Sequence, residues 1–177
     1  MGAGKTTAIQ SLSEIDVVST EANNSERHIV DKATTTVALD YGEILIDGED
    51  KVRLYGIPGQ KRFDFMWSIL KKRAKGMILL VNSDAPDPIG EMIYFIDEFR
   101  ELYDRGGVVV GISRADVIAG PTLVEFSEAL ERANPDLVIP VFTVDPRDRD
   151  QMEDVLLTLI ANIEMRAMFG MTTAGAL

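Results

Sequence analysis

The chain opens with Met-Gly-Ala-Gly-Lys-Thr-Thr, a run of residues that could bind phosphate. Gly4, Lys5 and Thr6 match the second half of the pattern G-x-x-x-x-G-K-[ST]. Backbone N–H groups from Gly2 to Thr7 would surround an anion at a helix N-terminus, where the helix dipole favours negative charge. Lys5 would reach the β- and γ-phosphates, and the Thr6 hydroxyl would bind Mg²⁺. The first glycine of the pattern would lie upstream of the first residue, so this tripeptide alone is a weak signal.

A second candidate segment is Tyr-Gly-Ile-Pro-Gly-Gln, which directly follows a strand-like run. The N–H of Gly59 can approach a terminal phosphate, and the next residue, Gln60, can orient an attacking water. A simple turn is the alternative, because Pro58-Gly59 is a common turn pair. A turn alone does not explain the glutamine.

The third and fourth segments follow two further apolar runs and could bind a base. Asp116, in Ser-Arg-Ala-Asp, can accept two hydrogen bonds from N1–H and N2–H₂ of guanine. Adenine lacks this donor pair, so the carboxylate would discriminate between the two bases. The alternative role for Asp116 is to cap the following turn. The backbone N–H of Val144 could meet the guanine carbonyl, although this fourth signal is nearly non-specific.

The pattern of elements predicts a single α/β domain with a mostly parallel sheet. Ligands of such sheets bind at the carboxyl ends of the strands, which is where the last three segments lie. The apolar periodicity predicts an antiparallel hairpin near 36–57, strands within 76–84, 106–113 and 137–144, and helices over 5–14, 62–74, 88–99, 121–130 and 149–166.

Composition excludes several classes of function. The net charge of −11 argues against a nucleic-acid partner and against a polybasic membrane anchor. The absence of cysteine excludes disulfides, thiolate metal sites and thiol catalysis, and the C-terminus offers no cysteine for a lipid anchor. The one histidine, His28, lies in a polar run that suits a solvated loop better than a catalytic base. With no secretion signal or membrane span in the sequence, we expect a cytoplasmic protein.

In this order and at these strand ends, the four segments resemble those of the Ras-like small GTPases. The Pro-Gly-Gln form of the second switch resembles bacterial members, including the gliding-polarity GTPase and predicted GTPases similar to the signal-recognition-particle receptor β subunit. The resemblance implies a P-loop NTPase fold with one antiparallel hairpin and helices on both faces of the sheet. It implies a GTPase domain over 1–168. The tail over 169–177 is small and polar enough that we expect it to be disordered.

The resemblance also implies roles for individual residues, with GTP or GDP as the ligand and Mg²⁺ as the cofactor. Lys5, Gln60 and Thr36 would be catalytic, with Thr35 as the alternative to Thr36. Thr6 and Thr36 would hold Mg²⁺. The nucleotide would be bound by Gly2, Gly4, Lys5, Thr6, Thr7, Gly59, Ser113, Arg114, Asp116 and Val144.

The chain departs from the family pattern at several positions. Where many members have an aspartate at the start of the second switch, this chain has Gly56. Either the affinity for Mg²⁺ is then lower, or another residue, Asp40 or Asp84, supplies the missing carboxylate. Ser113 and Arg114 replace the usual asparagine and lysine; the planar guanidinium can still stack on a base. The first strand of the fold and half of the phosphate loop are missing. We therefore expect the native protein to extend upstream of Met1.

Three functions remain open from the sequence. The first is a slow GTP-hydrolysing switch in bacterial signalling or polarity. Its segments 18–36 and 56–67 would contact protein regulators, either GAP-like or roadblock-type. The second is a non-catalytic binding module with the same fold. The third is a P-loop kinase for a nucleotide or small molecule, which would need an arginine-rich lid.

Overall fold

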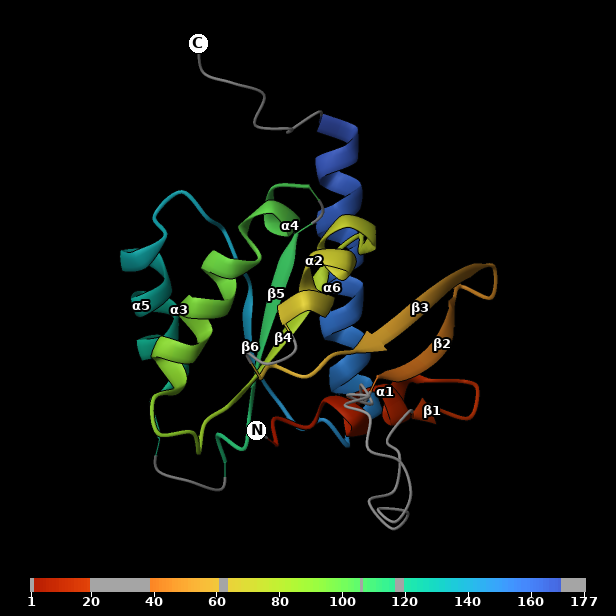
Figure 1. Ribbon diagram of the computed structural model, residues 1–177, viewed down its shortest axis with the longest axis horizontal. Coiled ribbons are helices and arrows are strands. Elements are labelled where there is room, and N and C mark those ends of the chain that lie inside the picture. Colours follow the sequence, from red (N-terminus) through yellow and green to blue (C-terminus); the bar gives the residue numbers. More distant parts are fainter. Residues whose placement is uncertain (1, 20–38, 61–63, 106, 117–119, 170–177) are drawn as a thin grey trace, which may run out of the picture.

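A computed structural model describes residues 2–19, 39–60, 64–105, 107–116 and 120–169 (Figure 1). Thr36, its alternative Thr35, most of the first switch segment and residues 170–177 lie outside these ranges. After an N-terminal helix and a hairpin, the described elements alternate between helices and strands, except where two helices follow one another. The sequence predicted this order apart from two short elements, a strand and a helix.

A parallel sheet of three strands forms the centre of the molecule. Its strands are β4 (Met77–Asn82), β5 (Val108–Ser113) and β6 (Val141–Val144), in the spatial order β4-β5-β6. Every residue of the middle strand β5 is buried. A strand covered on both faces needs a continuous apolar run, and the sequence of β5 supplies one.

Helices cover both faces of this sheet, as Figure 1 shows. On one face, α3 (Pro88–Glu98) and α5 (Leu123–Ala133) contribute Met92, Ile96, Phe126 and Leu130 to a core with β4 and β5. On the other face, α1 (Lys5–Leu12) and α6 (Arg149–Phe169) pack in a second core. The predicted α/β class, with helices on both faces, is confirmed.

An antiparallel hairpin extends to one side of the parallel sheet (Figure 1). Its strands are β2 (Asp40–Ile46) and β3 (Asp50–Gly56), joined by a turn in which Asp47 and Gly48 have positive φ angles of 53° and 74°. Glycine and aspartate are among the residues that adopt this conformation most readily. The hairpin predicted from the alternating pattern is confirmed.

A short strand, β1 (Val18–Ser19), pairs with the start of β2 and completes a three-stranded antiparallel sheet. The sequence did not predict it, because two residues are too few to show a period.

The two sheets share no hydrogen-bond ladder in the part of the chain that the structure describes. β3 belongs to the antiparallel sheet and β4 to the parallel one. No described strand pairs with both β3 and β4. One apolar cluster instead joins the sheets: it contains Ile44 from the hairpin, Val109 from β5, and Met152, Val155 and Leu156 from α6.

Local sequence explains where several helices begin and end. At α5, Thr122 and Glu125 form a reciprocal capping box. At α3, the Asp87 side chain accepts a hydrogen bond from the Gly90 N–H, and Pro88 occupies the first turn. That helix stops at Phe99, and α4 (Arg100–Arg105) follows as a separate short helix that the sequence did not predict.

Two aromatic side chains of α3 and its C-terminal end hold a further helix in place. Trp67 of α2 (Asp64–Arg73) is buried, with ring centroids 5.6 Å from Phe95 and 5.8 Å from Phe99. Among the described helices, none is both long and apolar enough to cross a membrane.

Candidate functional site

The N-terminal loop of the chain leads directly into α1 and surrounds a hollow of about 280 Å³, lined by residues 2–7. Gly2 and Gly4 have φ angles of 82° and 85°, in the left-handed region that favours glycine. Gly4 is the N-cap of α1, and no side chain caps this end. Free backbone N–H groups of a first helical turn, together with the helix dipole, favour an anion at this position.

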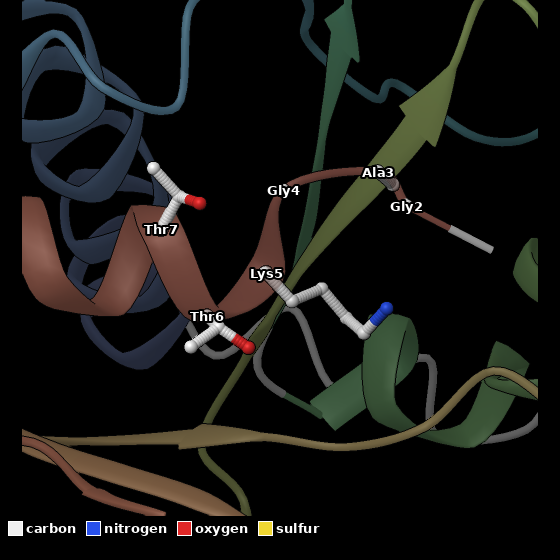
Figure 2. A pocket seen from close by; sticks show the side chains of 6 residues that line it. All are labelled: Gly2, Ala3, Gly4, Lys5, Thr6 and Thr7. Carbon is white, nitrogen blue, oxygen red and sulfur yellow. The ribbon is translucent and has the colours of Figure 1, made fainter.

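The two predicted phosphate and metal contacts lie on the same side of this loop. Figure 2 shows the side chains of Lys5 and Thr6 extending to one side and that of Thr7 to the other. Burial lowers the pKa of the Lys5 ammonium below its ordinary 10.5, and the negative charge of Asp40 opposes this effect. A partly desolvated ammonium gains stability from an anion, and a phosphate would supply one.

Asp40, at the start of β2, is a carboxylate partner of the loop. The Thr6 hydroxyl donates a hydrogen bond to Asp40 Oδ2 at 2.5 Å. In the hairpin register, Asp40 stands opposite Gly56, the last residue of β3. A Cβ atom placed on Gly56 would lie 3.1 Å from Asp40 Cβ and 3.3 Å from Asp40 Oδ2. Together with Ile9 Cδ1, which would be 2.7 Å from the same Cβ, the side chain of Asp40 therefore fills the space beside Gly56.

The donor set of this corner fits Mg²⁺. Mg²⁺ takes oxygen ligands and is usually held by one or two carboxylates together with the phosphates of the substrate. The Thr6 hydroxyl and the Asp40 carboxylate provide such oxygens side by side. No group of three or more acidic or histidine side chains that could hold a metal occurs among the described residues. An ion here would therefore depend on the nucleotide for part of its coordination.

The predicted second switch is held by the aromatic side chains of α2 and α3. The Trp67 Nε1–H donates to the carbonyl of Pro58 at 3.2 Å, and a Cβ on Gly59 would come within 3.2 Å of Phe95 Cζ. Gly59 is exposed and Gln60 is half-buried. These contacts fix the turn that carries the predicted γ-phosphate and water contacts. Their roles stay predictions.

The predicted base-binding residues lie at the carboxyl ends of β5 and β6. Ser113 is buried, donates its hydroxyl to the Val81 carbonyl at 3.2 Å, and stands in register with Val144. Arg114 has a positive φ of 62° and lies 3.8 Å from an Asp84 carboxylate oxygen. Asp116 is exposed. The hydroxyl of Ser113 thus ties β5 to β4, and Arg114 and Asp116 are the members open to a ligand.

A turn that follows β6 joins the loop to this base end. Pro146 packs so closely on Gly4 that a Cβ there would be 2.6 Å from Pro146 Cγ. The neighbouring Arg147 donates from Nη2 to Asp145 Oδ2 at 2.7 Å and from Nε to Asp145 Oδ1 at 2.9 Å. These bonds lower the pKa of Asp145 to about 2. They also raise the pKa of Arg147, to which the charge of Asp116 adds a smaller effect.

Sequence reasoning missed Pro146, and it considered Arg147 only as a possible arginine of a kinase lid. The only signal for them was their place directly after the last strand of the sheet. Their contacts bring the phosphate loop and the base segment, about 110 residues apart in sequence, to the same end of the molecule. Of the predicted site residues, Thr36 lies outside the described part of the chain.

One comparison with known proteins gives a match. A family model described as a conserved hypothetical ATP binding protein matches residues 15–136, more than half of the chain. The matched range contains the hairpin, the Pro58-Gly59-Gln60 turn and the segment 113–116, and it begins after the phosphate loop. No curated protein matches the chain.

Proposed function

The chain belongs to the family of conserved hypothetical ATP binding proteins, and from that premise we propose that it is a nucleotide-dependent switch that binds and slowly hydrolyses GTP. Nucleotide binding is the property that the family description supplies. The finer assignment, to guanine and to hydrolysis, draws on the residues of the site.

The observation that carries the proposal is the junction of two ends of one site. Pro146 packs on Gly4 of the phosphate loop, and its neighbour Arg147 is electrostatically coupled to Asp116. To bind one nucleoside triphosphate, a phosphate-binding loop and a base-binding group must lie no farther apart than the length of the nucleotide. The turn 145–147 supports the idea that both belong to the same site.

Guanine is favoured over adenine by the chemistry of Asp116. A carboxylate accepts the paired N1–H and N2–H₂ donors of guanine, whereas adenine would leave it without partners. The ATP in the family description favours a second candidate, an adenine nucleotide as the natural ligand. The two candidates differ in which nucleotide, GTP or ATP, should bind more tightly.

Hydrolysis in this proposal uses the residues around the terminal phosphate. Lys5 would stabilise the charge on the β- and γ-phosphates, and the N–H of Gly59 would bind the γ-phosphate. Gln60 would orient the attacking water. Mg²⁺, when bound, supplies charge neutralisation at the phosphate oxygens, and Thr6 and Thr36 would hold it. Segments 18–36 and 56–67 would then carry the nucleotide state to a GAP-like or roadblock-type regulator, and a cytoplasmic location fits this role.

The two other functions are less well supported by the side chains that the structure describes. A kinase lid would need free arginines, but Arg147 pairs with Asp145, and Arg149 pairs with Glu153 at 2.6 Å. A non-catalytic module is favoured by Gly56, where a carboxylate is usual in the families that the chain resembles. Hydrolysis measurements separate this module from a switch.

Calorimetric titration of the whole chain with GTP and with ATP, each with and without Mg²⁺, tests nucleotide choice. We expect GTP to bind more tightly than ATP. We also expect Asp116→Ala to lower the ratio of the two affinities by about 10- to 100-fold, the contribution of one bidentate base contact. An unchanged ratio in Asp116→Ala, or tighter ATP binding by the wild type, would contradict the guanine assignment.

Single-turnover hydrolysis tests the switch itself. We expect slow conversion of bound GTP to GDP, and a further loss of rate in Gln60→Leu with nucleotide affinity retained. Binding without any turnover in the wild type would favour the non-catalytic module instead.

A further inference from the structure

We propose that Asp40 supplies the protein carboxylate of the Mg²⁺ site, taking from the neighbouring strand the place that Gly56 leaves without a side chain. This inference rests on the proposed function, since the ion would be bound together with a nucleotide. It decides between the two carboxylates, Asp40 and Asp84, that the sequence left open.

The first argument is the position of Asp40 in the hairpin. Asp40 and Gly56 are directly opposite each other in the antiparallel register of β2 and β3. Residues in such pairs have Cβ atoms about 4.5–5.5 Å apart, so a carboxylate on either strand can reach the same point. A Cβ on Gly56 would in fact meet the Asp40 side chain at 3.1 and 3.3 Å. A side chain on residue 56 would therefore be crowded by Asp40 and, at 2.7 Å, by Ile9 Cδ1.

The second argument is the contact between Asp40 and the phosphate loop. Thr6, whose hydroxyl is the predicted metal ligand, donates that hydroxyl to Asp40 Oδ2 at 2.5 Å. The carboxylate therefore already lies against the hydroxyl that would bind the ion.

Asp84, the other candidate from the sequence, is engaged elsewhere. Its carboxylate lies 3.8 Å from Nη1 of Arg114, at the end of the site that would hold the base. The backbone N–H of Asp84 donates to the Asn82 side chain at 3.1 Å, which fixes the residue at the end of β4. Asp40 thus remains the carboxylate with a contact to the loop.

The experiment measures how much Mg²⁺ strengthens GTP binding, as the ratio of the dissociation constants in EDTA and in millimolar Mg²⁺. In Asp40→Asn the side chain keeps its shape and an oxygen that accepts from Thr6 but loses its charge. We expect the ratio to fall by about tenfold or more, the usual effect of removing a group that supports a metal site. The affinity for GTP measured in EDTA should change little.

Two matched variants serve as controls, since each also removes one carboxylate charge. Asp50→Asn lies at the far end of the same hairpin, opposite Ile46, and Asp84→Asn tests the competing residue. Both should keep the wild-type ratio. A wild-type ratio in Asp40→Asn, or a loss confined to Asp84→Asn, overturns the assignment. A wild type that binds no GTP in either buffer ends the proposed function and this inference together.

A reciprocal exchange tests the geometry. We expect Asp40→Gly to lose the Mg²⁺ effect and the double variant Asp40→Gly/Gly56→Asp to regain it. In the double variant the remaining close contact of the new Cβ is Ile9 Cδ1 at 2.7 Å, the far end of a side chain. If that contact prevents folding, as judged by circular dichroism, adding Ile9→Val removes the crowding methyl. A folded exchange variant without the Mg²⁺ effect would overturn the cross-strand explanation.

Discussion

At the scale of single residues, the carboxyl group of Asp145, in the turn after β6, has a strongly lowered pKa. Its carboxylate accepts hydrogen bonds from both the guanidinium and the backbone N–H of Arg147. Bonds that favour the charged form lower the pKa, here from 3.8 to about 2. Because the folded value is the lower one, the pair favours the folded protein above pH 3.8, and this contribution is lost as the pH falls through about 2.

We predict that Arg147→Gln moves the pKa of Asp145 up toward its ordinary 3.8. The loss of the guanidinium bonds, the largest cause of the shift, is the reason. Carbon-13 NMR titration of the side-chain carboxyl measures the change directly. Arg149→Gln is the control, because its guanidinium pairs with Glu153 and Glu14 instead. A value still near 2 in Arg147→Gln would show that another group holds the carboxylate charged.

At the scale of elements, the entry to α1 combines an unusual backbone conformation with a tight contact. Gly4 and Gly2 share almost the same positive φ, but only Gly4 meets Pro146. Gly2→Ala should therefore show the backbone cost alone, at most about 1–2 kcal/mol. Gly4→Ala should add the cost of overpacking, a further ~1–3 kcal/mol. Urea unfolding of the two variants measures the difference.

The contact with Pro146 also predicts a functional difference between these variants. Gly4→Ala moves the turn 145–147 and should weaken GTP binding more than Gly2→Ala does. Pro146→Gly in the Gly4→Ala chain relieves the contact and should restore part of the lost stability. Equal effects of the two alanine variants on stability would mean that the loop can move away from Pro146 at no cost in free energy.

At the scale of the whole molecule, α6 joins the hairpin to the parallel sheet. No described ladder connects β3 to β4, so the apolar cluster that contains Ile44, Val109 and Leu156 carries the connection. Leu156 is 3% exposed, whereas the next residue, Leu157, is 46% exposed. The pair allows a matched comparison on one helix.

We predict that Leu156→Ala lowers the free energy of unfolding by about 2–5 kcal/mol, through lost burial and the cavity left behind. Leu157→Ala should change it by less than about 0.5 kcal/mol, as exposed positions usually do. Equilibrium urea unfolding gives both values. Similar losses in the two variants would place the junction of the sheets somewhere other than this face of α6.

Much of this fold could be predicted because its elements follow strong periodic patterns. The apolar stripe on α6 predicts a helix with one buried face, and the unbroken apolar run of β5 predicts a strand buried on both faces. The structure has both. β1 and α4 could not be predicted in the same way. β1 has two residues, and the break at Phe99 depends on how α3 and α4 pack around Trp67 and Leu102 rather than on any local stop signal.

The candidate site was predictable only where its residues are contiguous. Gly4, Lys5 and Thr6 form a motif that the sequence displays directly. The pairing of Asp40 with Gly56 depends on the hairpin register, so the sequence could name Asp40 only as one of two alternatives. Pro146 and Gly4 come together through the whole fold, and no spacing rule connects positions so far apart.

The opposition of Asp40 and Gly56 also has an evolutionary consequence. An acidic side chain at position 40 or at position 56 would occupy the same space. Relatives of this chain should therefore carry the acid at one of these positions but not at both, and some lineages should have it at position 56 instead of 40. An aligned set of relatives in which these two columns vary independently would show that selection treats them as unrelated. Paired exchanges of the acid between the two positions would support the proposal that this corner binds a metal ion.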